Sequence, residues 1–179
     1  MKPAGAVGAA LLDGGPDLLR AAFRRHPAGV AVITAAAPAA PGAGGAAARP
    51  VGFTASSVAS VAADPPLLSF GVGTGSSTWP VLAEATHVGV HFLGEHQQDV
   101  AETFARHGAD RFAPPLTWRP GPFSVPVLGD VPVWLVCRVA GRVPAGDHRV
   151  VIAEVVAGDA AGPGRPLLYH QGRFTALRD

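Results

Sequence analysis

Residues Gly52–Gly71 read GFTASSVASVAADPPLLSFG and carry hydroxyl side chains where a fully buried strand would carry only apolar ones. The hydroxyl residues at the start of this stretch are Thr54, Ser56, Ser57 and Ser60. The turn-forming residues Asp64–Pro66 then precede the apolar run Leu67–Phe70, which can form a buried strand. Because short hydroxyl side chains both donate and accept hydrogen bonds, this pattern indicates the wall of a pocket for a polar ligand.

Strand patterns outnumber helix patterns in the rest of the chain. Apolar and β-branched runs predict strands at 30–34, 88–93, 131–143, 149–156, 167–169 and 173–177. Amphipathic spacing predicts helices at 18–26, with Asp17 as the N-terminal cap, and at 95–107. Many short strands with a few packing helices favour an antiparallel barrel over a doubly wound parallel sheet.

Composition narrows the class of protein. The 179 residues suit one domain, and 48% apolar against 15% charged residues suggests a surface partly covered by another subunit. A formal net charge of +1 provides no broad field for a nucleic acid backbone, so nucleic acid is not an expected partner. The single cysteine, Cys137, excludes an intrachain disulfide and is expected in the core.

The apolar part of residues 1–16 is short and glycine-rich and lacks a credible cleavage site, which predicts a disordered tail before one domain at 17–179. No run of about eighteen apolar residues occurs, so no membrane span is expected. We therefore expect a cytoplasmic protein.

Three segments together resemble the flavin reductase family of FMN-binding split barrels, the small reductases of two-component flavin monooxygenases. They are Gly52–Phe70, Gly146–His148 and the segment PLLYHQGRF at Pro166–Phe174. The resemblance implies a mainly β fold, a six-stranded antiparallel split barrel with a few peripheral helices, assembled as a homodimer. It also implies hydride transfer from NADH or NADPH to FMN, with FAD as the alternative flavin, and a monooxygenase that receives the reduced flavin.

The turn Gly71–Thr78 reads GVGTGSST and is not a dinucleotide fingerprint, because Ser76 stands where the third glycine is required. Hydroxyls and free N–H groups at a helix start suit an anion, and the resemblance implies that Ser76, Ser77 and Thr78 approach the FMN phosphate. The alternative is an ordinary helix cap supplied by Ser76 or Ser77.

The resemblance also assigns further residues to the flavin. Thr54, Ala55, Ser56 and Ser57 match the segment beside the ring and ribityl chain. From the residues alone, the alternative is an ordinary strand edge rich in serine and threonine. The other expected contacts are Pro27, Gly29, Ser60, His91, Phe92, Phe112, Tyr169 and Phe174.

Three positions bear on activity. His148, in the motif Gly146–Asp147–His148, is the expected catalytic residue. The resemblance implies that it lies near the nicotinamide side of the flavin, where it would either orient NAD(P)H or tune the charge as the hydride leaves. His91 replaces an asparagine common in the family and is expected to line the flavin pocket, where its titratable proton would alter flavin affinity or redox poise. Ala153 stands where the family often has glycine.

Two other functions remain open at this point. One is a split-barrel flavoprotein that holds FMN tightly and acts directly on another small molecule, since fold alone does not determine activity. The other is a non-catalytic flavin-binding partner of an oxygenase.

No pair of histidines has convincing metal spacing. His87 and His91 are four residues apart, but on a strand they would lie about 13 Å from each other, too far to bind one ion.

Overall fold

A computed structural model of the chain describes residues 14–37 and 49–177. The helices are α1 (Pro16–Arg24), α2 (Trp79–Glu84) and α3 (Gln98–Ala105), with short 3-10 turns η1 (Glu95–Gln97) and η2 (Pro122–Ser124). The strands are β1 (Ala28–Gly29), β2 (Ala31–Ala36), β3 (Pro50–Ala55), β4 (Ala59–Ala62), β5 (Leu67–Gly73), β6 (His87–Phe92), β7 (Trp118–Pro120), β8 (Pro126–Leu128), β9 (Val133–Ala145), β10 (His148–Asp159), β11 (Leu167–His170) and β12 (Arg173–Ala176).

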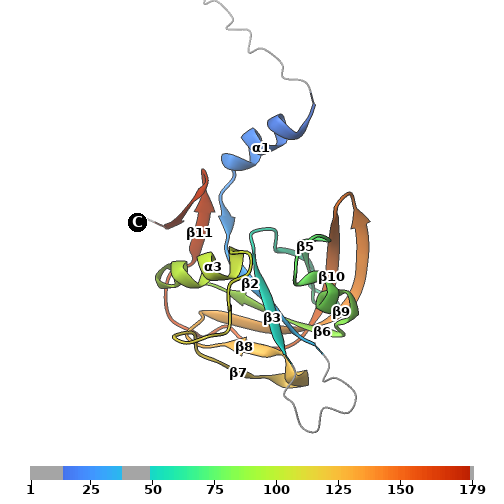
Figure 1. Cartoon of the computed structure of the whole chain (residues 1–179), viewed down its shortest axis with the longest axis vertical. Helices are drawn as coiled ribbons and strands as arrows, with labels where there is room; N and C mark the ends of the chain where they lie inside the picture. The colour runs from blue at the N-terminus through green and yellow to red at the C-terminus, as the bar shows by residue number, and fades with distance from the viewer. Residues whose placement is uncertain (1–13, 38–48, 178–179) are drawn as a thin grey trace, which may run out of the picture.

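The main sheet is antiparallel and has the strand order β3-β2-β6-β9-β10-β5-β4 (Figure 1). Its seven strands include the short edge strand β4, one strand more than the six expected. The pair β7–β8 and the small sheet β1-β11-β12 lie outside it. The prediction of a mainly β, antiparallel fold with few helices is therefore confirmed.

The run Leu67–Phe70 forms a strand as predicted, and burial alternates along β5. Leu68, Phe70 and Val72 point into the core, whereas Gly71 and Gly73 lie on the opposite face. The long strands β9 and β10 pair with each other and form a hairpin whose tip extends to the end of β5. The outer face of β5 and the hairpin tip are therefore side by side.

Helix α3 holds the edge strand β3 in place. The Thr54 hydroxyl donates a hydrogen bond of 2.6 Å to the Ala101 carbonyl of α3, and the Phe104 ring lies directly over Gly52. Any side chain at Gly52 would collide with that ring and with the Ile33 carbonyl. Glycine thus allows α3 to pack closely on the strand that carries the hydroxyl residues.

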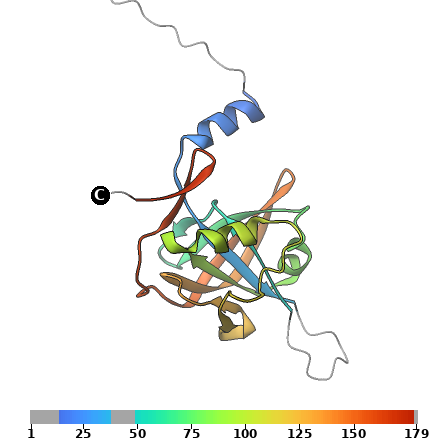
Figure 2. The same ribbon diagram turned by 60° about the vertical axis from the view of Figure 1, so that its left-hand side comes forward.

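Helix α1 differs from the sequence prediction and stands away from the body of the protein (Figures 1 and 2). It begins at Pro16 with Gly15 at the cap, so the prediction of Asp17 as the cap was wrong; Asp17 pairs with Arg20 at 3.0 Å instead. None of its residues is buried, and Phe23 is 65% exposed. Most of the expected disordered tail, residues 1–13, lies outside the described residues.

Among the helices of the described residues, none has the length and apolar character needed to cross a membrane.

Candidate functional site

The first candidate site, cavity A, joins the end of β3 to α3 and the β11–β12 hairpin and encloses about 620 Å³. It is lined by Val30, Thr54, Ser56, Gln98, Glu102, Ala105, Arg106, Tyr169, Gly172, Arg173 and Phe174. Tyr169 and Phe174 meet edge to face with their ring centres 5.2 Å apart. Cavity A therefore combines the expected hydroxyls with two of the expected aromatic rings, in a volume typical of ligand pockets.

A second hollow, cavity B, of about 640 Å³, continues from cavity A because both are lined by Ser56, Tyr169 and Gly172. It adds Ser57 and the α1 residues Arg20, Phe23 and Arg24. The Ser57 hydroxyl accepts a 2.9 Å hydrogen bond from the Gly71 N–H, which ties the segment after β3 to the outer face of β5. The predicted wall at Thr54–Ser57 thus faces two connected hollows.

The outer edge of β3 offers backbone groups as well as hydroxyls. Within the described chain β3 pairs only with β2, and the Gly52 carbonyl on its other side accepts a 3.2 Å hydrogen bond from the Thr78 hydroxyl. Alternate residues of a strand direct their N–H and C=O groups to the same side, so Thr54 also directs its backbone groups away from β2. A planar ligand with both donors and acceptors fits this edge.

Cavity C lies at the opposite end of β3 and encloses about 750 Å³. Its lining includes three predicted flavin residues, Ser77, Thr78 and Phe112. The Thr78 side chain is buried and its hydroxyl is bound to Gly52, whereas Ser77 is exposed. Ser76 accepts a 3.2 Å bond from the Thr78 N–H within the turn, and α2 has no side-chain cap. Ser77 is therefore the hydroxyl available to a ligand here.

Arg111, which the sequence did not single out as a flavin contact, also lines cavity C. One guanidinium nitrogen donates to the Arg106 carbonyl at 2.8 Å, while Nε is buried without a hydrogen-bond partner in the described chain. Burial lowers the pKa of this guanidinium. Arg49 also lines cavity C, and Asp110 is the one carboxylate among the described lining residues, so this end of β3 suits an anion. The sequence signal that could have identified Arg111 is its position next to Phe112, an expected flavin contact.

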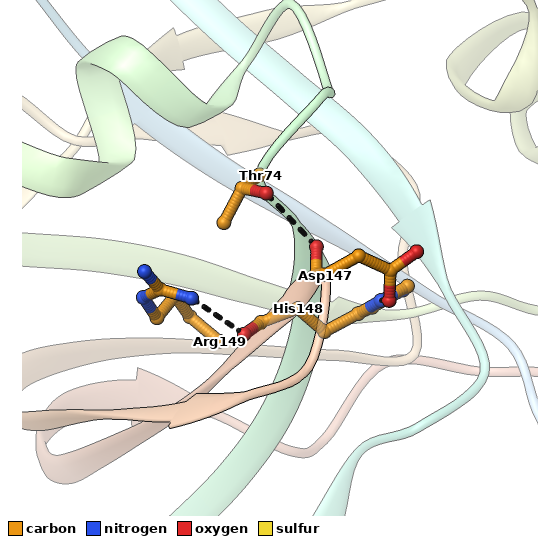
Figure 3. A network of polar contacts seen from close by, with 4 residues as sticks. All are labelled: Thr74, Asp147, His148 and Arg149. Carbon is orange, nitrogen blue, oxygen red and sulfur yellow. Dashed lines mark hydrogen bonds and ion pairs between the residues drawn. The ribbon is translucent and has the colours of Figure 1, made fainter.

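His148 lies at the tip of the β9–β10 hairpin (Figure 3). Its Nδ1 is 2.7 Å from the Asp147 carboxylate, and this hydrogen bond is the main reason that the pKa of Asp147 is lowered. His148 lines none of cavities A, B and C. Its ring lies over Gly73 on the outer face of β5. Ser57 lies over Gly71 on the same face, and Gly71 and Gly73 are one strand repeat of about 7 Å apart.

His91 lies inside the protein, away from these cavities, contrary to the expectation that it lines the flavin pocket. It is fully buried, and its Nδ1 is 3.1 Å from the Val32 carbonyl, so Nδ1 carries the proton. Nε2 has no partner in the described chain, and burial lowers the pKa of His91 to about 4. The side chain shares one face of β6 with Gly89, whose neighbours include Thr34 and Val125.

Other expected contacts line none of cavities A, B and C. Ala55 and Phe92 pack in the hydrophobic core, as does Ala153. Pro27, Gly29 and Ser60 are exposed and line none of the three cavities, although Ala28 and Val30, the neighbours of Gly29, line cavities B and A. The structure therefore brings together Thr54, Ser56, Tyr169 and Phe174 in one group, and Ser77, Thr78 and Phe112 in another.

Comparison with known proteins identifies the family. Residues 23–178 match the family described as flavin reductase like domain. The chain belongs to this family. An NADH:FMN oxidoreductase of Rhodococcus erythropolis is 42% identical to this flavin reductase like domain over 159 residues, which are 87% of this chain and 78% of the relative.

Two further relatives extend the comparison. The reductase component of a 4-nitrophenol 4-monooxygenase/4-nitrocatechol 2-monooxygenase from Rhodococcus opacus is 37% identical over 70% of this chain and 66% of its own length. The crystal structure of a flavin reductase domain protein from Arthrobacter sp. FB24 superposes with a TM-score of 0.82 at 40% identity, over 91% of this chain and 96% of that one. The resemblance inferred for this flavin reductase like domain from its sequence is thus confirmed.

Proposed function

We propose that this protein is a flavin reductase that uses NADH to reduce FMN and supplies the reduced flavin to a separate monooxygenase. The observation that carries the proposal is the position of β3. One strand contributes Thr54 to cavity A, beside Ser56, and Gly52 to cavity C, beside Ser77 and Arg111. A polar ring binds the first group and a phosphate binds the second. Relatives named as NADH:FMN oxidoreductase and monooxygenase reductase component support the same activity.

The residues present fit FMN. When bound, FMN would supply the capacity to take up hydride from NADH, and the residues of this chain would bind and orient the two molecules. The free edge of β3 at Thr54 and the Ser56 hydroxyl bind the polar edge of the ring, and Tyr169 and Phe174 cover its apolar surface. Arg111 and Ser77 bind the phosphate through charge and hydrogen bonding. His148 orients the nicotinamide.

We also infer a homodimer. Val143 and Val150 are direct partners on β9 and β10, yet they are 49% and 36% exposed, and the apolar side of α1 exposes Leu19 and Phe23. A second copy would cover these surfaces. Light scattering should give twice the 18.1 kDa of one chain. A mass equal to one chain would contradict the dimer.

Because NADH is the reductant, we place the reaction in the cytoplasm.

The first test is nicotinamide oxidation, followed by the absorbance at 340 nm with NADH or NADPH and with FMN, FAD or no flavin. Oxidation of NADH that rises with added FMN is expected. Slow oxidation that added flavin does not stimulate, with FMN retained through gel filtration, would indicate a flavoprotein acting on another small molecule. Bound flavin without any nicotinamide oxidation would indicate a non-catalytic binding protein.

A further inference from the structure

Thr74 links the end of β5 to the tip of the β9–β10 hairpin (Figure 3). Thr74 directly follows β5 and donates two hydrogen bonds to the same acceptor, the Asp147 carbonyl. The backbone N–H is 2.9 Å from this oxygen and the side-chain hydroxyl is 3.0 Å from it. The hydroxyl therefore adds a bond that the strand ladder cannot supply.

This bond acts at the point where the ladder ends. The last residue pair between β10 and β5 is His148 with Gly73, and the turn beyond it includes Gly146 with a positive φ of 60°. Strand ends open at low free energy cost, so a turn at this position moves unless other contacts restrain it. Besides Thr74, the tip is restrained by Arg149, whose guanidinium lies 5.9 Å from the centre of the Trp79 ring on α2.

The orientation of His148 depends on the position of this turn. Its Nδ1 faces the Asp147 carboxylate at 2.7 Å, and its Nε2 lies 3.7 Å from the point that a Cβ on Gly73 would occupy. Because Nδ1 is engaged by the carboxylate, Nε2 is the ring nitrogen left over Gly73 on the outer face of β5. A displaced Asp147 would turn the imidazole with it.

We propose that Thr74 is a positioning residue of flavin reduction, which holds the Asp147–His148 turn so that the His148 ring stays against β5. This assignment rests on the proposed function, in which His148 orients the nicotinamide. Thr74 touches neither cavity A nor cavity C and acts through His148. Its loss should therefore affect NADH more than the flavin.

The test compares Thr74→Val, which keeps the shape of the side chain and removes the hydroxyl, with Thr74→Ser, which keeps the hydroxyl. We expect Thr74→Val to lower kcat/KM for NADH by about tenfold, the effect of one lost hydrogen bond of ordinary strength. The FMN dissociation constant, measured by flavin fluorescence, should change by less than about twofold. Thr74→Ser should restore most of the activity. Thr86→Val is the matched control, because this exposed threonine lies on the bend before β6 and its hydroxyl is 3.1 Å from Nδ1 of the neighbouring His87.

A double-mutant cycle separates positioning from a general structural role. In a His148→Ala background, Thr74→Val should cause no further loss of kcat/KM, because the residue through which it acts is absent. An equal loss in both backgrounds, or unchanged activity of Thr74→Val, would overturn the role of Thr74 while leaving the proposed function intact. Absence of NADH oxidation by the wild-type protein with every flavin would overturn the proposed function and this role together.

Discussion

His91 should make the stability of the folded protein depend on pH. The imidazole is fully buried and neutral, and its pKa is about 4 in the folded state against 6.5 when exposed. Between these values the unfolded chain binds a proton that the folded chain does not, so the free energy of unfolding falls as the pH is lowered from 6.5 toward 4. Above pH 6.5 both states are neutral at this residue and the effect vanishes.

The magnitude follows from the difference in pKa. Each pKa unit corresponds to about 1.4 kcal/mol, so the whole shift amounts to about 3 kcal/mol, of which about 2 kcal/mol is lost between pH 7 and pH 5. The cause is that a proton added at Nε2 would create a buried cation with no acceptor. For comparison, the whole free energy of unfolding of a typical domain is roughly 5 to 15 kcal/mol.

Urea unfolding at pH 7, 6 and 5 tests this expectation by comparing the wild-type protein with His91→Asn and His91→Gln. Either variant removes the titrating group, and two are used because one of them can lose the fold. Between pH 7 and pH 5 the wild-type protein should lose about 2 kcal/mol more unfolding free energy than either variant loses. A difference that stays constant with pH would refute the assignment of a buried neutral imidazole.

Three other expectations concern the site and the core. Arg111→Gln should weaken FMN binding about tenfold and riboflavin binding much less, as measured by flavin fluorescence, because riboflavin has no phosphate; equal weakening of both would argue against an anion site at cavity C. His148→Ala should lower NADH-dependent turnover more than flavin affinity, and unchanged turnover would remove this residue from the mechanism. Burial raises the pKa of the Cys137 thiol to about 12, so Ellman's reagent should modify it only after unfolding in urea, and rapid modification of the native protein would contradict its place in the core.

Local sequence patterns were sufficient for the strand content and for part of the site. The apolar run Leu67–Phe70 indicated the strand β5, and the cluster of hydroxyl residues that includes Thr54 and Ser56 indicated a polar wall, because both signals lie within one short window of the chain. The cap of α1 was misplaced because Pro16 starts a helix as readily as Asp17 caps it. Helix boundaries depend on such small differences between neighbouring residues.

Tertiary structure was needed wherever a side chain's environment comes from a distant segment. The sequence around a strand histidine does not show whether it faces a ligand or the core. His91 is buried because β6 lies between β2 and β9 and residues of other segments, such as Val125, cover its face of the sheet. Arg111 becomes a candidate anion ligand only because the fold brings it to the same cavity as Ser77 and Arg49, which come from other segments. Thr74 and Asp147 meet across 73 residues, and no local pattern encodes that contact, because it depends on how two long strands align on β5.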